Sequence, residues 1–248
     1  MATFRPGSHV VKCSHVILSV AISFFLLQTV SGQGAFGNLN FEQASIVSAP
    51  PDYTPSDAYN PISAGSALPY WTVREDGVVM TAVWGTPVAL DETSVALVSA
   101  GHSPIQGSYS VQLSAYADAP AGLYHSSSIS QTGFIPVGSQ SIQFLIASPS
   151  QAGSIQPNPI VTLNGTPIGI SKVSQAGGVI TMAGDVSAFA GTTATLAVLC
   201  QATQGAAFPG NENIFNLDGI QFVPEPNCLA LVGLGGIFFG LRRWRSQS

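Results

Sequence analysis

The residues that could carry acid, base or nucleophilic chemistry are few. Between Gln33 and Val223 the chain has two histidines, His102 and His125, that could act as bases near neutral pH. The segment from Gly101 to Ile105 (GHSPI) begins like the G-x-S-x-G turn of serine hydrolases, but isoleucine stands where that turn needs its last glycine. No nucleophile, base and orienting group stand at a recognisable spacing, so we expect a protein that is not an enzyme.

The sequence has no pattern typical of a zinc site or of nucleic-acid binding. Two isolated histidines and Cys200 do not have the spacing of a zinc site, and Cys200, on an alternating run, is expected to be a buried small side chain. No glycine-rich loop precedes a Lys-Ser/Thr pair. Between residues 33 and 223 two basic residues face eleven acidic ones, a net charge of −9. This charge would repel nucleic acid, so we expect no nucleic-acid partner.

Exposed aromatic rings are the other candidates, because the apolar faces of sugars stack on them. Tyr53 and Tyr59 lie in a proline-rich segment and are the predicted ligand-binding residues. Trp71 and Trp84 have apolar neighbours at alternate positions, which favours places in the core. Further aromatic candidates on predicted strands are Tyr70 and Tyr124.

The elements that must position these side chains are strands. Only 8% of the residues are charged and 46% are hydrophobic, which excludes a disordered chain. About a dozen alternating or β-branched runs, among them 38–42 and 78–84, are separated by Gly, Pro, Asn and Ser. Asp76-Gly77 and Asn164-Gly165 predict tight hairpins. We therefore expect an all-β domain over 33–222, an antiparallel jelly-roll sandwich.

Two segments of this body depart from the strand pattern. Residues 44–68 contain four prolines and predict a long loop, since neither a helix nor a central strand tolerates that density. Residues 184–190 allow one short helix, with Asp185 as its cap.

The N-terminus has the order of a secretory signal peptide. Arg5 and Lys12 precede the apolar run 16–30, and Gly32 follows as a small residue at the expected cleavage point. We therefore predict a signal peptide, with a signal helix, over 1–32. An uncleaved N-terminal anchor is the alternative, although the run is short for spanning a bilayer core of about 30 Å.

The C-terminus carries a second membrane signal. Val223, Pro224, Glu225 and Pro226 are followed by an apolar stretch, 227–241, and by a basic cluster made of Arg242, Arg243 and Arg245. We expect 227–241 to be a short transmembrane helix whose arginine flank stays cytoplasmic. The body would then lie outside the membrane.

This order of motifs, over 223–248, resembles the PEP-CTERM sorting signal of Gram-negative bacteria. The resemblance implies recognition by an exosortase, a membrane-embedded cysteine protease-transpeptidase thought to cut at the Pro-Glu-Pro motif. It implies a chain exported through the inner membrane, anchored by its C-terminal helix before processing, and then placed at the cell surface or outside the cell.

The body resembles the galactose-binding-like sandwiches of carbohydrate-binding modules and of many exported bacterial proteins. The segments that carry this resemblance are weak one by one but occur in order: 38–42 (NLNFE), 68–71 (LPYW), 107–113 (GSYSVQL), 161–165 (VTLNG), 185–191 (DVSAFAG) and 216–222 (NLDGIQF). In such sandwiches a structural calcium ion often lies where the first and last strands meet. The matching positions are Glu42 and Asp218, whose carboxylates are hard ligands suited to Ca²⁺.

Two hypotheses follow for the function. The first is an exported, non-enzymatic protein of the cell surface or extracellular matrix. The second is a carbohydrate-binding module on the same scaffold, with an exopolysaccharide as its partner.

Overall fold

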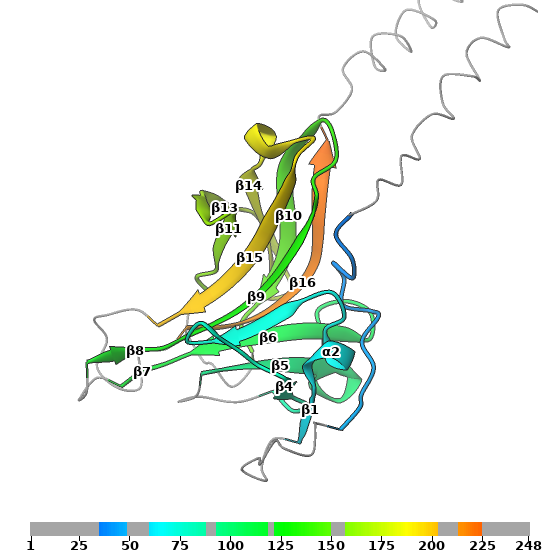
Figure 1. Cartoon of the computed structure of the whole chain (residues 1–248). Coiled ribbons are helices and arrows are strands. Elements are labelled where there is room, and N and C mark those ends of the chain that lie inside the picture. The colour runs from blue at the N-terminus through cyan, green and yellow to red at the C-terminus, as the bar shows by residue number, and fades with distance from the viewer. Residues whose placement is uncertain are drawn as a thin grey trace, which may run out of the picture. The chain divides into compact units, whose positions relative to one another are not determined.

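The computed structural model describes residues 35–48, 60–87, 93–118, 122–149, 157–202 and 213–224 (Figure 1). The predicted signal peptide, the tyrosines Tyr53 and Tyr59, and the sorting signal from Glu225 onward, with its membrane segment 227–241 and its arginines, lie outside the described residues. Among the residues described, no helix has both the length and the apolar character needed to cross a membrane.

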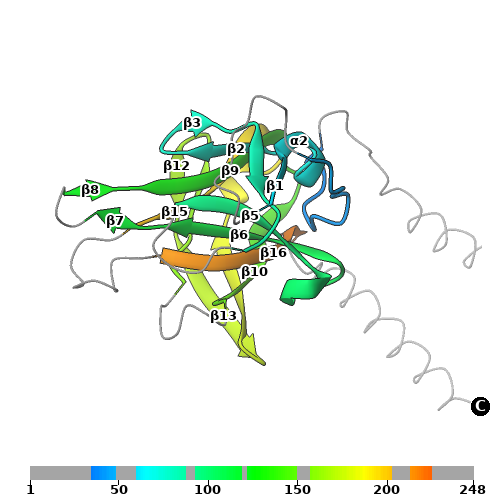
Figure 2. The same cartoon turned by 90° about the horizontal axis from the view of Figure 1, so that it is seen from below.

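Within these residues the larger sheet has eight strands. Figure 2 shows four of its central strands, β5, β6, β16 and β10, side by side. Across the sheet the strands run in the order β1 (Pro61–Ser63), β4 (Ala82–Trp84), β5 (Ser94–Ser99), β6 (Tyr109–Ala115), β16 (Asn213–Pro224), β10 (Ser139–Ala147), β14 (Val179–Asp185) and β13 (Ile170–Ala176).

A smaller sheet faces the larger one across the core. Its described strands run in the order β12 (Thr166–Ile168), β11 (Ile160–Leu163), β15 (Thr193–Gln201), β9 (Ser126–Phe134), β2 (Thr72–Glu75) and β3 (Val78–Val79). A two-stranded arm, β7 (Ala117–Asp118) with β8 (Leu123–Tyr124), extends from one end (Figure 1). The short helices are α2 (Ala64–Ala67), η1 (Ala100–His102) and η3 (Ser187–Phe189).

Alternation along the strands builds the core between the two sheets. On β6, Val111 and Leu113 point inward, as do Phe215 and Leu217 on β16, and all four are fully buried in one hydrophobic cluster. Residues that alternate with them point to the outer face of the larger sheet. The two-sheet, all-β architecture predicted from the sequence is confirmed, and all its strand pairs are antiparallel except the parallel pair β4–β5.

Both predicted hairpin turns are present. Asp76 and Gly77 join β2 to β3 with φ of 48° and 80°, and Asn164 and Gly165 join β11 to β12 with φ of 51° and 78°. Positive φ at both central residues is the type I′ geometry that matches the twist of paired strands. The predicted short helix is the single turn η3, where the Asp185 carboxylate accepts a hydrogen bond from the Ser187 backbone N–H.

The structure corrects three expectations. The predicted loop 44–68 ends in ordered structure, because Ile62 of β1 and Ala64 and Ala67 of α2 are buried against the core. The predicted strand 38–42 is a turn with positive φ at Asn38 and Phe41. The run 78–84 is divided between two sheets, with β3 in the smaller and β4 in the larger.

Candidate functional site

The outer face of the larger sheet carries a groove of about 400 Å³. This volume is within the range of about 300–1,000 Å³ that is usual for small-molecule sites. We call it the amide groove, after the two side chains on its floor, Gln112 of β6 and Asn216 of β16. The described residues that line it are Pro87, Gly101, His102, Ser103, Gln112, Ala147, Ser148, Pro149 and Asn216.

Strand register places the two floor amides next to each other. Gln112 and Asn216 are direct partners in the antiparallel pair β6–β16, and Ala147 of β10 is the next partner beyond Asn216. Direct partners in a sheet present their side chains on the same face. The floor is thus built from three strands, and its side chains are held by rigid elements.

The Gln112 side chain is only partly satisfied. Its Nε2 donates to Asn216 Oδ1 over 3.3 Å, whereas its Oε1 is buried and has no hydrogen-bond partner among the described residues. Gln112 is 1% exposed and Asn216 is 7% exposed. Leaving a buried acceptor unpaired costs about 1–3 kcal/mol. Because this oxygen is itself covered, a ligand in the groove accepts or donates at this amide only when the Gln112 side chain turns toward it.

The walls of the groove combine polar and apolar groups and carry no acidic, Lys or Arg side chain among the described lining residues. One wall is the end of η1, where Ser103 has the left-handed backbone (φ 58°) that turns the chain after His102. Facing groups are Pro87 and the segment 147–149. Such a groove can hydrogen-bond hydroxyl groups and cover apolar C–H surface, and the His102 imidazole is the one ionisable side chain among its described lining residues.

The segment 101–105, which resembles the start of a serine-hydrolase turn, lies at this groove, but its described residues do not form a catalytic hydrogen-bond network. His102 and Ser103 both line the wall, but no hydrogen bond joins His102 to a carboxylate or to a serine among the described residues. The described structure therefore contains no nucleophile–base–acid relay at residues 101–105.

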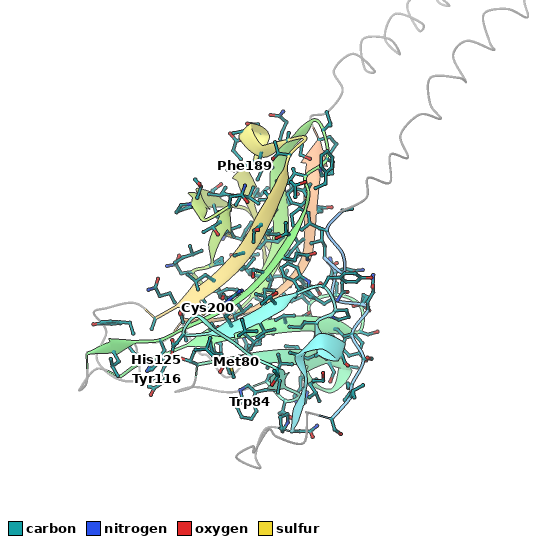
Figure 3. All side chains as sticks on the ribbon, viewed as in Figure 1. Met80, Trp84, Tyr116, His125, Phe189 and Cys200 are labelled. Atoms are coloured by element: carbon teal, nitrogen blue, oxygen red, sulfur yellow. The ribbon has the colours of Figure 1, made fainter. Side chains whose placement is uncertain are left out.

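The other predicted base, His125, has a structural role. Its Nδ1 lies 2.7 Å from Asp76 Oδ2, and its ring stacks on Tyr116 with centroids 4.9 Å apart (Figure 3). The other Asp76 oxygen accepts from the Ser126 backbone N–H. Partial burial raises the pKa of Asp76, but the hydrogen bonds from His125 and Ser126 outweigh it, so the pKa lies below its usual value. The pair ties the β2–β3 turn to the start of β9.

The predicted calcium residues Glu42 and Asp218 do come together, on either side of the loop 105–109. Glu42 Oε1 accepts from the Ser108 and Tyr109 backbone N–H groups at 2.9 and 3.1 Å. Asp218 Oδ2 accepts from the Gln106 backbone N–H at 3.0 Å and from the Ser110 hydroxyl at 2.9 Å. The two carboxylates therefore fasten this loop to the sheet.

This arrangement does not fit a calcium ion. Ca²⁺ takes about six to eight oxygen ligands, and the carboxylate oxygens here face N–H and O–H donors, whose positive ends repel a cation. The described residues contain no group of three or more His, Cys, Asp or Glu side chains that could hold a metal. Burial raises the pKa of Asp218, and the charge of Glu42 adds to the rise, although hydrogen bonds from Ser110, Gln106 and Gly219 oppose it.

The aromatic candidates differ in how exposed they are. Trp71 is buried, as predicted, and its Nε1 donates to the Asn38 carbonyl at 3.1 Å. Trp84 is half-buried, and Tyr70 and Tyr124 are exposed. The sequence analysis did not select Gln112 and Asn216. The signal for them was present, because Ser110, Gln112 and Ser114 alternate with buried apolar residues and so share the opposite face of β6.

The predicted sorting motif begins inside the fold. Val223 and Pro224 are the last residues of β16 and pair with Ser141 and Ser139 of β10. The rest of the motif, Glu225 and Pro226, lies outside the described residues. No spacer therefore separates the final strand from the predicted cleavage motif.

Comparisons with known proteins find little. No protein-family model matches the chain, and no curated protein matches it. Among solved structures, the chain is similar to the carbohydrate-binding module TmCBM61, determined in complex with β-1,4-galactotriose, at 15% sequence identity and a TM-score of 0.35. That similarity covers 78% of this chain and 100% of the module.

Proposed function

We propose that the β-domain is a non-enzymatic binding module that holds a neutral, hydroxyl-rich ligand, a saccharide, in the amide groove. The observation that carries this proposal is the unpaired Gln112 Oε1 on the floor. A hydroxyl group donates and accepts at once, so one sugar hydroxyl can donate to Gln112 Oε1 and accept from a neighbouring donor. The apolar lining from Pro87, Ala147 and Pro149 suits the C–H faces of a sugar ring.

The test is binding of purified full-length protein, in detergent, to an array of neutral glycans, followed by calorimetric titration. The informative variant is Gln112→Met, which keeps the length of the side chain and removes the acceptor. The matched control is Gln201→Ala, an exposed glutamine on β15 of the other sheet. We expect Gln112→Met to lose binding by about tenfold or more, which corresponds to about 1.4 kcal/mol. An array with no signal for the wild type, or a variant that binds unchanged, contradicts the proposal.

We further propose that the chain is exported, anchored by segment 227–241 and sorted by an exosortase, so that the module acts at the cell surface or in the extracellular matrix. The support is the order of the N-terminal signal, the Pro-Glu-Pro motif, the apolar stretch and the arginine cluster. Because β16 ends at Pro224, cutting after this residue would leave every described strand intact.

Expression in a Gram-negative host with and without its exosortase tests the sorting proposal. Intact-mass analysis of the surface fraction should show a new N-terminus after Gly32 and a C-terminus within the motif 224–226, the latter only with the exosortase. The change Glu225→Ala should block the C-terminal cut, whereas Glu212→Ala should not. A C-terminus that is the same in both hosts refutes exosortase processing.

A further inference from the structure

A second groove, of about 270 Å³, lies on the same outer face of the larger sheet. Its floor pairs Gln143 of β10 with Gln221 of β16, which are direct partners in the antiparallel register. Thr181 of β14 also lines it, and Asn40 and Gln106 belong to its rim. We call it the glutamine groove. The described lining residues include no acidic or basic side chain.

The two floor glutamines are available to a ligand. Gln143 is half-buried and Gln221 is exposed, and neither side-chain amide makes a hydrogen bond among the described residues. Side-chain amides fixed on adjacent strands present donors and acceptors side by side, as in the amide groove. Both groove floors present neutral side-chain amides that can form hydrogen bonds, and in both grooves these amides stand on central strands of the larger sheet.

The segment 103–108 separates the two grooves. It crosses β16 at Asp218, to which the Gln106 backbone N–H is bonded, and Asp218 lies between Asn216 of one groove and Gln221 of the other. A β-bulge at Gly219, with φ 58°, bends β16 at this point. Asn216 and Gln221 are five residues apart on β16. At about 3.3 Å per residue, the floors of the two grooves therefore lie about 16 Å apart along this strand.

We propose that the glutamine groove is a second binding site for the same class of neutral saccharide, so that one extended polysaccharide chain occupies both grooves. This inference rests on the proposed function of the amide groove. Two linked sites convert the second contact into an intramolecular event and can raise affinity by about 10²–10⁴ without any new contact at the first site. A ligand too short to span both floors gains nothing.

The experiment is calorimetric titration of full-length protein with oligosaccharides of increasing length from β-1,4-galactan, β-1,4-xylan and β-1,4-glucan. For the series that binds, we expect the wild-type affinity to rise at least tenfold once the oligosaccharide is long enough to reach both grooves. The double change Gln143→Ala and Gln221→Ala should abolish that rise and leave the affinity for short oligosaccharides unchanged. Gln112→Met should weaken binding at every length.

The control is Gln175→Ala, an exposed glutamine on β13, which should leave the length dependence intact. Because neither floor glutamine is fully buried and neither side-chain amide is hydrogen-bonded among the described residues, their removal should shift the melting temperature no more than this control does. Binding that is independent of length, or a rise that survives the double change, overturns the second site and leaves the amide groove standing. If the wild type binds none of the three series and no neutral glycan of the array, both proposals fail.

Discussion

The change Gln112→Met should leave the stability of the protein nearly unchanged and weaken its binding. In the free protein the buried Gln112 Oε1 has no partner among the described residues, and relieving that cost is worth about 1–3 kcal/mol. The same change removes the 3.3 Å hydrogen bond from Nε2 and leaves the buried Asn216 Oδ1 without a partner, which costs about 1–3 kcal/mol. The two effects nearly cancel, so the melting temperature should stay within roughly 2–4 °C of the wild type.

Gln131 supplies the matched control, since it is also a buried glutamine but has both amide atoms bonded. Its Oε1 accepts from the Gly37 backbone N–H at 2.9 Å, and its Nε2 donates to the Gly37 carbonyl at 3.0 Å. Gln131→Met therefore leaves a donor and an acceptor of Gly37 without partners, and should destabilise the fold by about 2 kcal/mol or more. The two changes are chemically identical, and only the hydrogen bonds of the native side chain differ.

The assay is thermal unfolding of wild type and both variants, with and without a saturating neutral oligosaccharide from the array. At about 100 times the dissociation constant a ligand stabilises the native state by about 2.7 kcal/mol, and this shift should be present in the wild type and reduced in Gln112→Met. A lower melting temperature in Gln112→Met together with an undiminished ligand shift would show that this amide serves the fold and not the ligand.

Four further predictions follow from the buried and paired groups. Because the folded-state pKa of Asp218 is raised above its unfolded value of 3.8, the protonated carboxyl stabilises the native state at low pH and this contribution is lost as pH rises; the stability of Asp218→Asn relative to wild type should therefore improve as pH rises above 3.8, and a parallel pair of pH profiles contradicts this. The pKa of Asp76 is lowered, so its stabilisation is present above its unfolded value of 3.8 and lost as pH falls below it; Asp76→Asn should be less stable than wild type at pH 7, with the gap closing in acid denaturation profiles. Burial raises the pKa of the Cys200 thiol, which donates to the Asn213 carbonyl, so in the double variant Cys13→Ser and Cys228→Ser a chromogenic disulfide reagent should react with Cys200 only at the rate of unfolding; fast labelling of the native double variant refutes the burial. Calcium titration should give no heat and no change in melting temperature, and a calcium-dependent shift abolished by Glu42→Gln would overturn our interpretation of the two carboxylates as loop fasteners.

The strands and hairpins could be predicted because local chemistry decides them. Asn164-Gly165 adopts the positive φ values that these two residue types favour in a tight turn. The predicted strand 38–42 is wrong because a local side-chain hydrogen bond and a distant aromatic contact overrule its alternating pattern. Asn38 Oδ1 accepts from the Gln43 backbone N–H, and the Phe41 ring packs against Trp71 with centroids 5.7 Å apart, which together stabilise a turn.

The site could be predicted only in part. Alternation places Gln112 and Asn216 on the face opposite the core, where polar residues are expected to meet solvent. The hydrogen bond between them joins positions 104 residues apart, and segments 101–103 and 147–149 line the groove beside them. The sequence has no local signal for the hydrogen bond or for the groove. Aromatic residues are conspicuous in a sequence, and they therefore drew the prediction toward Tyr53 and Tyr59, outside the described residues.

The scarcity of charge in this domain determines how it can bind. Glu42 and Asp218 are occupied in holding the loop 105–109, and the described lining of the grooves presents neutral amides. A neutral site has no long-range attraction for its ligand, and each sugar hydroxyl bound must give up water, so the net gain at one groove is small. In the function that we propose, a long polymer would offset this small gain through repeated contacts along one chain. Two grooves about 16 Å apart on one strand would do this within a single domain.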